Sequence, residues 1–252
     1  MGKQARLKSR EVRKAQAAIA AQRKSPINVV TWIGGLVIVG LLIAIVAVVV
    51  NATRDAKGSD GKLVNPANLT ASEALLVGQA SAPVTVEIYL DYMCPACGRF
   101  ETTNAAELDR LIDAKTINLE LRPMNFLDKQ SQGSRYSTRA ANAVATVADQ
   151  APDKVWAFTK ALYANQPEEG TTGLSDQAIA DLAVQAGVAQ TVADRFKDRT
   201  FDAWVTESND DAFEAGVTGT PTVKINGTKF EGDVYTVGPL TQAIEQAAGG
   251  AK

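Results

Sequence analysis

Residues 84–97, VTVEIYLDYMCPAC, decide the fold of this 252-residue chain. Apolar and polar side chains alternate from Val84 to Leu90, which is the period-two pattern of a half-buried strand. A helix is predicted to begin at Pro95 and continue to about Ala114, and a second strand is predicted from Ile117 to Leu121. A strand–helix–strand unit of this kind implies two parallel strands joined by a right-handed crossover.

The C-terminal part of the chain predicts a helical block followed by a second strand unit. Residues from about 131 to 213 have the spacing of several helices, and Ser175 stands where a helix N-cap is expected. Short strands are predicted at Thr222–Asn226 and Thr228–Glu231, joined by an Asn-Gly hairpin turn. A last helix is predicted at Leu240–Ala248. The fold class is therefore α/β, in the order βαβ, helical block, ββα.

The chain has two cysteines, Cys94 and Cys97, and no histidine. The missing histidine excludes Ser-His-Asp and Cys-His catalysis, and two thiolates cannot complete a four-thiolate zinc site. No metal and no cofactor is therefore expected. A disulfide between residues three apart closes a small loop, and such a bond contributes little to stability in the loop-closure account. Two buried, unpaired thiols remain an alternative.

A redox pair is the interpretation that gives both cysteines a mechanism. Cys94 ends a strand and opens a helix, where backbone N–H groups and the helix dipole stabilise a thiolate. Pro95 suits the first helical position because its nitrogen needs no partner. Cys97 lies one turn further along the helix. The arrangement predicts Cys94 as nucleophile and Cys97 as resolving thiol, exchanging disulfides through a mixed-disulfide intermediate.

Three stretches of the chain together resemble the DsbA-like thioredoxin-fold proteins of bacterial envelopes. They are VTVEIYLDYMCPACGRFE around the cysteines, KVWAFTKALYANQP in the helical block and AGVTGTPTVKING at the second strand unit. The resemblance covers about residues 80–248. It implies a thioredoxin fold interrupted by an all-helical subdomain at about 131–214, with Pro95 and Ala96 as the active-site motif between the cysteines.

The resemblance also implies a substrate-binding loop and a redox partner. The Thr220–Pro221 peptide bond would be cis and would face the cysteines, where the Thr220 backbone can pair with an extended substrate. The implied substrates are unfolded or reduced exported proteins. A membrane enzyme of the DsbB or VKOR type would then reoxidise the Cys94–Cys97 redox disulfide.

Two positions depart from the pattern of that family. Ala96 stands where the best-known member has a histidine that stabilises the thiolate. The pKa of Cys94 is therefore expected above the extreme of about 3.5, and the potential between about −270 mV for thioredoxin and about −120 mV for DsbA. Ile88 stands six residues before the first cysteine, where relatives commonly carry an acid. Glu87 is interpreted as a paired or partly solvated residue and Asp91 as an ordinary loop residue, and neither is assigned a role.

The N-terminal segments predict a membrane anchor. Residues 1–28 form a basic tail with eight basic residues and one acid, whereas the chain after Ala52 holds 18 basic and 27 acidic residues. Residues 29–50 are uncharged over about 22 residues, which is long enough for a transmembrane helix. The positive-inside rule places the N-terminus in the cytoplasm. The catalytic domain then lies outside the membrane, after a linker and domain lead-in at residues 51–79.

An uncleaved signal anchor is favoured over a cleaved signal peptide, whose apolar region is normally about 7–15 residues long. The basic tail lacks interleaved aromatic residues, so anionic lipid and not nucleic acid is its expected partner. The preferred function is a membrane-tethered thiol oxidase of exported proteins. The alternatives are an envelope disulfide reductase or isomerase using the same exchange, and a non-enzymatic substrate-binding or chaperone module.

Overall fold

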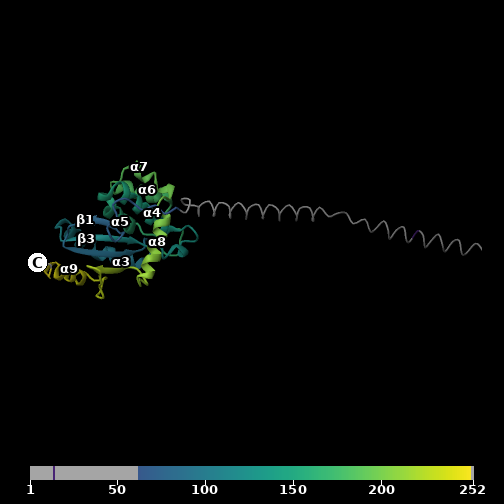
Figure 1. The fold of residues 1–252 in the computed structure, drawn as a ribbon. Coiled ribbons are helices and arrows are strands. Elements are labelled where there is room, and N and C mark those ends of the chain that lie inside the picture. The colour runs from purple at the N-terminus through teal and green to yellow at the C-terminus, as the bar shows by residue number, and fades with distance from the viewer. Residues whose placement is uncertain (1–13, 15–61, 251–252) are drawn as a thin grey trace, which may run out of the picture. The chain divides into compact units, whose positions relative to one another are not determined.

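The computed structural model describes Lys14 and residues 62–250, and the latter range contains a five-stranded mixed sheet with helices packed around it (Figure 1). The strands are β1 (Leu75–Gly78), β2 (Val84–Leu90), β3 (Ile117–Pro123), β4 (Thr222–Ile225) and β5 (Thr228–Lys229). Their order across the sheet is β1-β3-β2-β4-β5. The central strand β2 pairs parallel with β3 and antiparallel with β4.

The helices fall into three groups along the chain. Helix α3 (Pro95–Asp113) connects β2 to β3, and α9 (Pro239–Gly250) follows the last strand. Between β3 and β4 lies a helical insert of α4 (Tyr136–Gln150), α5 (Val155–Ala164), α6 (Asp176–Gln185), α7 (Gln190–Ala193) and α8 (Asp202–Glu214), with short 3-10 turns at Asp128–Gln130, Pro152–Lys154 and Phe196–Asp198. Figure 1 shows α4 to α7 gathered on one side of the sheet, with α9 on the other.

The strand–helix–strand unit predicted from local sequence is confirmed. Strand β2 begins and ends at the predicted residues, and its partner β3 continues two residues further, to Pro123. The predicted hairpin forms between β4 and β5, and both residues of its turn adopt positive φ, 48° at Asn226 and 79° at Gly227. Asparagine and glycine are the residues that tolerate this backbone conformation best, which is why the dipeptide locates the turn.

Strand β1 is the element that the sequence pattern does not reveal. Leu75–Gly78 pairs antiparallel with β3, so the sheet begins before residue 80, where the domain is predicted to start. These residues belong to the segment 51–79 that is interpreted as linker and lead-in. Four residues are too few for alternation to distinguish a strand from a loop.

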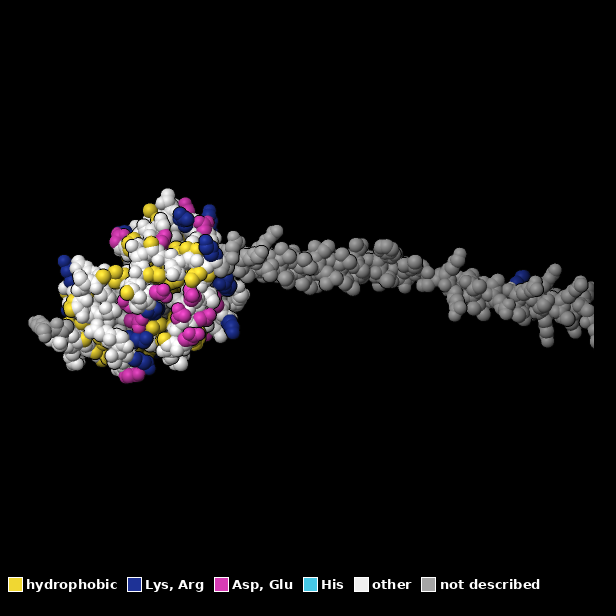
Figure 2. All heavy atoms as spheres, viewed as in Figure 1, with side chains coloured by type: hydrophobic (Ala, Val, Ile, Leu, Met, Phe, Trp, Pro, Cys, Tyr) yellow, Lys and Arg dark blue, Asp and Glu magenta, His cyan; other side chains and the backbone are white. Residues whose placement is uncertain are grey.

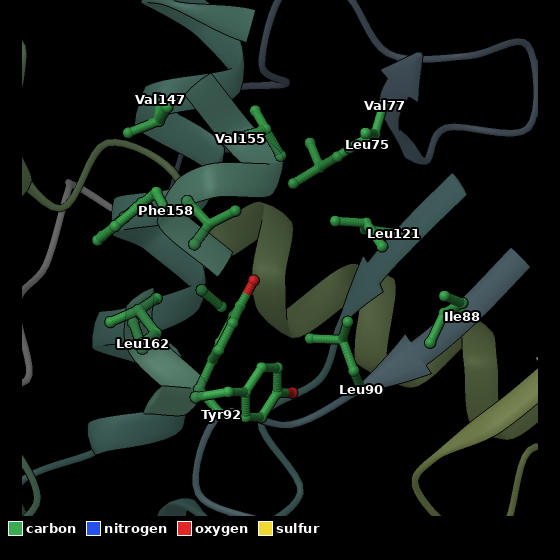
Figure 3. Close-up of a cluster of buried hydrophobic side chains, with 14 of the residues drawn as sticks. Leu75, Val77, Ile88, Leu90, Tyr92, Leu121, Val147, Val155, Phe158 and Leu162 are labelled. Carbon is green, nitrogen blue, oxygen red and sulfur yellow. The ribbon is translucent and has the colours of Figure 1, made fainter. Parts of the chain in front are cut away.

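One hydrophobic core joins the helical insert to the sheet. Figure 3 shows side chains of the strands facing side chains of α5 across this core: Leu75, Leu90, Leu121, Val155, Phe158 and Leu162. Tyr92 follows β2 and enters the same core, where its hydroxyl lies 3.3 Å from the hydroxyl of Thr159 on α5. Because Tyr92 stands two residues before Cys94, the core also fixes the turn that carries this cysteine.

Within residues 62–250, no helix combines the length and the hydropathy that crossing a bilayer requires. The predicted transmembrane segment at 29–50 lies outside the described residues. So do the basic tail at 1–28, apart from Lys14, and the first part of the linker, up to residue 61.

Candidate functional site

Two segments that are far apart in the sequence meet at one edge of the sheet. Because β4 runs antiparallel to β2, the start of β4 lies beside the end of β2. This topology brings Thr220 to Cys94, whose thiol donates a hydrogen bond to the Thr220 carbonyl oxygen at 3.4 Å. The Thr220–Pro221 peptide bond is cis. Cys94, Cys97, Thr220 and Pro221 are therefore neighbours, although the sequence places them in two distant stretches.

The local sequence explains why Cys94 stands at the start of a helix. Cys94 is the N-cap residue of α3 with extended backbone angles, φ −71° and ψ 116°, and Pro95 follows as the first helical residue. The Cys94 carbonyl accepts the first helical hydrogen bonds, from the N–H of Cys97 at 3.0 Å and of Gly98 at 3.2 Å. The N–H groups of Ala96 and Cys97 in the first turn also interact with the sulfur, where they favour negative charge.

The two thiols differ in exposure and in acidity. Both are free, and Cys94 is 9% exposed whereas Cys97 is 1% exposed. A hydrogen bond from the Cys97 thiol lowers the pKa of Cys94 to about 5. The Thr220 hydroxyl and the N–H groups of Cys97 and Ala96 act in the same direction, and partial burial opposes them. This pKa lies above the extreme of about 3.5 that a histidine-containing motif reaches.

Burial raises the pKa of the Cys97 thiol well above its ordinary value, and the hydrogen bond to Cys94 and the negative charge there add to the effect. At neutral pH the reduced pair therefore consists of a thiolate at Cys94 and a thiol at Cys97. The thiolate is the more accessible sulfur, and thiolates are the species that attack disulfides. The arrangement is chemically suited to thiol–disulfide exchange.

A glutamine from the helical insert holds the turn that carries the nucleophile. The Gln166 side-chain amide donates to the carbonyl oxygens of Tyr92, at 3.1 Å, and Cys94, at 2.9 Å. Gln166 follows α5 in a polar loop, so no local pattern connects it to residues 72 and 74 positions earlier. Its role at the site is visible only in the tertiary structure.

Two acids near the cysteines behave differently. Glu87 forms ion pairs with Arg122, at 2.5 Å, and with Lys224, at 3.3 Å, so its interpretation as a paired residue is confirmed. Asp91, by contrast, is not an ordinary loop residue, because its side chain is completely buried. Burial raises the pKa of Asp91 to about 7, although hydrogen bonds from Ser137, Leu127 and Met93 act in the opposite direction.

The described residues also bear on whether the site could hold a metal ion. Within residues 62–250, no three side chains of His, Cys, Asp or Glu converge as a metal site requires.

The sequence matches the thioredoxin family model over residues 70–246. It is 37% identical over 124 residues to the serine/threonine-protein kinase PknE of Mycobacterium tuberculosis, covering 48% of this chain but only 21% of the kinase. It is 27% identical over 154 residues to disulfide bond formation protein D of Bacillus subtilis, covering 60% of this chain and 67% of that protein. The reduced crystal structure of DsbA from M. tuberculosis is similar, with a TM-score of 0.56 and 27% identity over 71% of this chain and 99% of that one. The chain thus spans about a fifth of the length of its kinase relatives.

Proposed function

Because the chain belongs to the thioredoxin family, we propose that it is a membrane-tethered thiol:disulfide oxidoreductase of the DsbA type that oxidises cysteines of exported proteins. The observation that carries the proposal is the unequal pair, in which Cys94 has a pKa of about 5 and Cys97 a pKa well above the ordinary value. The likeness to DsbA of M. tuberculosis and to disulfide bond formation protein D supports the same chemistry.

The exchange starts from the oxidised Cys94–Cys97 pair, and its electrons pass directly from the substrate thiols to this disulfide. A substrate thiolate attacks the Cys94 sulfur, forming a mixed disulfide and breaking the Cys94–Cys97 bond. Cys97 leaves with the electron pair and takes up a proton, as its raised pKa requires. A second substrate thiolate then attacks the substrate sulfur of the mixed disulfide and releases the Cys94 thiolate. The substrate has gained one disulfide, and the pair has gained two electrons.

The acidity of Cys94 supports oxidation as the direction of this exchange. A thiolate with a pKa of about 5 is a good leaving group, so the mixed disulfide resolves readily toward the substrate disulfide. Stabilising the thiolate also stabilises the reduced pair relative to its disulfide, which makes the disulfide a stronger oxidant. The protonated Cys97 is a poor nucleophile, so it does not quickly displace the substrate before the second substrate thiol reacts.

The compartment and the redox partner are part of the same proposal. The uncharged span at 29–50 and the basic tail before it support a single-pass protein whose cysteine domain lies outside the cytoplasmic membrane. Disulfides form and persist in that environment. A quinone-linked membrane enzyme of the DsbB or VKOR type would reoxidise the pair after each cycle.

The direction of exchange is tested with two assays on the same preparation. The oxidised protein is expected to restore activity to reduced, unfolded ribonuclease and to be weak in the reduction of insulin by dithiothreitol. Cys94→Ser should abolish exchange, and Cys97→Ala should accumulate mixed disulfides with substrate. Strong insulin reduction without ribonuclease oxidation would assign the reductase or isomerase direction. Binding of unfolded protein unchanged by Cys94→Ser, with no exchange, would assign a chaperone module instead.

The location is tested in cells with the full chain. Membrane fractionation should find the protein in the membrane. A phosphatase that is active only outside the cytoplasm, fused to the C-terminus, should be active if residues 62–250 lie outside the cytoplasm. Thiol trapping should find the cysteines mostly oxidised at steady state, because the redox partner of an oxidase keeps its cysteines in the disulfide form. A soluble, cytoplasmic protein with reduced cysteines would contradict the proposal.

A further inference from the structure

Asp91 is a buried carboxylate at the centre of the contacts that hold the nucleophile turn. Its Oδ1 accepts hydrogen bonds from the Met93 N–H, at 2.8 Å, and from the Ser137 hydroxyl, at 2.7 Å. Its Oδ2 accepts one from the Leu127 N–H, at 2.9 Å. One side chain thus connects the turn before Cys94 with the loop after β3 and with α4 of the helical insert.

The backbone of Asp91 belongs to the same set of contacts. Its carbonyl oxygen accepts a hydrogen bond from the Cys94 N–H, at 3.0 Å, and another from the Tyr163 hydroxyl of α5, at 3.2 Å. The nucleophile is therefore fixed to Asp91 through the main chain.

Among residues 62–250, no Lys or Arg forms an ion pair with this carboxylate. The negative charge of the Cys94 thiolate disfavours ionisation of the Asp91 carboxyl. The titratable groups that interact with it come from the site and from the insert, and they are Cys94, Cys97, Tyr92, Tyr136 and Tyr163.

The phenols in this set stay neutral, because burial raises the pKa of each of them above its ordinary value. Cys97 is likewise a neutral thiol for the same reason. The charge that Asp91 senses across the physiological range is therefore that of the Cys94 thiolate. Two negative charges in a region of low dielectric repel each other far more strongly than they would in water.

We propose that Asp91 is a positioning residue that fixes the nucleophile turn to the helical insert and, when ionised, opposes the Cys94 thiolate and so weakens the disulfide as an oxidant. This inference rests on the proposed function and concerns the regulation of the same site. The thiolate exists only in the reduced pair. The charge of Asp91 therefore destabilises the reduced pair relative to the oxidised pair, in which Cys94 is uncharged.

The proton balance follows from this repulsion. On reduction the disulfide accepts two electrons and one proton, giving the Cys94 thiolate and the Cys97 thiol. Near neutral pH, Asp91 takes up a further fraction of a proton, because burial already raises the pKa of its carboxyl to about 7 in the reduced pair and the new thiolate contributes to that rise. The substrate supplies both electrons as its two thiols become a disulfide. The protons released by those thiols are sufficient for Cys97 and Asp91.

The test is Asp91→Asn, measured by the redox equilibrium of the full chain with glutathione. Removing the negative charge should stabilise the reduced pair, so the equilibrium constant for forming the disulfide should fall by about threefold or more near pH 8. The pKa of Cys94, followed by the ultraviolet absorbance of its thiolate, should fall as well. The difference between variant and wild type should disappear as the pH is lowered toward about 5, where Asp91 is protonated in the wild type.

A purely structural role predicts the opposite sign. If Asp91 only holds the turn, Asp91→Asn would loosen the donors around the sulfur, raise the pKa of Cys94 and make the pair less oxidising. The proposal is overturned if the equilibrium constant for forming the disulfide and the pKa of Cys94 rise or do not change in Asp91→Asn. Glu87→Gln is the matched control, because it removes a buried carboxylate from the strand that leads to Asp91, and the charge of Glu87 is already paired with Arg122 and Lys224. It should leave the glutathione equilibrium unchanged.

Ser137→Ala keeps the test decisive if Asp91→Asn does not fold. Loss of the Ser137 hydroxyl removes a hydrogen bond that stabilises the ionised carboxylate. Asp91 should then be more protonated near pH 7, and the glutathione equilibrium should shift in the same direction as in Asp91→Asn. No shift overturns the proposal. A wild-type protein that equilibrates with glutathione but fails to oxidise ribonuclease would refute the proposed function and leave this measurement intact.

Discussion

At Cys94 and Cys97, two identical side chains titrate differently because the start of one helix holds them at different depths. Cys94 keeps access to solvent and faces the donors of the first turn, whereas Cys97 lies one turn further along the helix, where burial dominates its acidity. The pair is coupled, because the thiol of Cys97 is itself the strongest stabiliser of the Cys94 thiolate. Replacing one cysteine therefore changes the acidity of the other.

Cys97→Ala is expected to raise the pKa of Cys94 above its wild-type value of about 5, because the sulfur loses the thiol that donates to it. Cys97→Ser keeps a hydroxyl donor of similar size and should leave the pKa closer to wild type. The absorbance of the thiolate against pH measures both. Equal pKa values in the two variants would show that the helix start and Thr220 alone set the acidity.

Glu101→Gln is expected to stabilise the protein above neutral pH. Glu101 lies on α3 one turn after Cys97, and burial raises its pKa from 4.5 to about 7. A carboxyl whose pKa is raised in the folded state stabilises the fold at pH values below the pKa of the unfolded chain. It loses that contribution as the pH rises through the folded-state pKa. The gain from Glu101→Gln should therefore grow between about pH 4.5 and 7, to about 1–3 kcal/mol. Urea unfolding at several pH values measures it, and the exposed Glu207→Gln serves as control.

Among the secondary-structure elements, the helices of the insert differ in how their ends are stabilised. Helix α6 begins at a serine whose hydroxyl accepts a hydrogen bond from the Ala178 N–H at 3.1 Å. Helix α8 has an exposed face of four acids, and Figure 2, viewed as Figure 1 is, shows acidic side chains gathered over this helix: Glu207, Asp210, Asp211 and Glu214. Its last turn contains no basic residue, so negative charge stands at the negative end of the helix dipole.

Ser175→Ala should lower the free energy of unfolding by about 1 kcal/mol, because the first turn of α6 loses its side-chain cap. The matched control is Gln177→Ala, which shortens an exposed side chain in the same turn without removing the cap. Urea unfolding compares the two. A loss in Ser175→Ala no larger than in the control would mean that water replaces the cap.

Glu214→Lys should raise the free energy of unfolding by about 0.3–1 kcal/mol, because it places a cation at the C-terminal end of α8. Glu207→Lys makes the same change in net charge in the middle of the helix, away from its end. Thermal unfolding at low salt should therefore separate the two variants. Equal effects would attribute the gain to general charge repulsion among the four acids.

At the scale of the whole molecule, the helical insert and the sheet share one core, and the redox site lies where they meet. Tyr92, Asp91 and Gln166 each connect the nucleophile turn to the insert. The ionisation of Cys94 is therefore linked to the stability of the fold as a whole. A thiolate that the folded state favours is a contribution to folding free energy.

The Cys94 thiolate is expected to contribute more to the stability of the reduced protein as the pH rises from about 5 to 9. Over this range the folded state holds Cys94 as thiolate while the unfolded chain keeps it protonated, since its pKa is lowered from 9.0 to about 5. A pKa that is lowered on folding gives a stabilisation that is fully present at pH values above the pKa of the unfolded chain. This stabilisation is lost as the pH falls through the pKa of the folded state. The contribution is on the order of 3 kcal/mol near pH 7. Unfolding curves of the reduced wild type and of Cys94→Ala should diverge with rising pH, and parallel curves would contradict the linkage.

Local sequence sufficed for those features that depend on contacts within a few residues. Alternation located β2, proline at the first helical position located α3, the Asn226-Gly227 pair located the hairpin, and Ser175 located the start of α6. The spacing of Cys94 and Cys97 singled out the redox pair, because both residues lie in one helical turn. The resemblance to DsbA-like proteins was needed for Thr220 and Pro221, which have no local connection to the cysteines.

The tertiary structure alone decided which polar residues are buried and what they contact. Strand β1 is recognisable by its pairing with β3, and not by its four residues. Asp91 has the sequence context of a loop residue, yet α4 and the loop after β3 cover it completely. Gln166 reaches the nucleophile turn from far along the chain. Periodicity records which way a side chain points along its own element, whereas burial and charge environment depend on segments that folding brings from elsewhere.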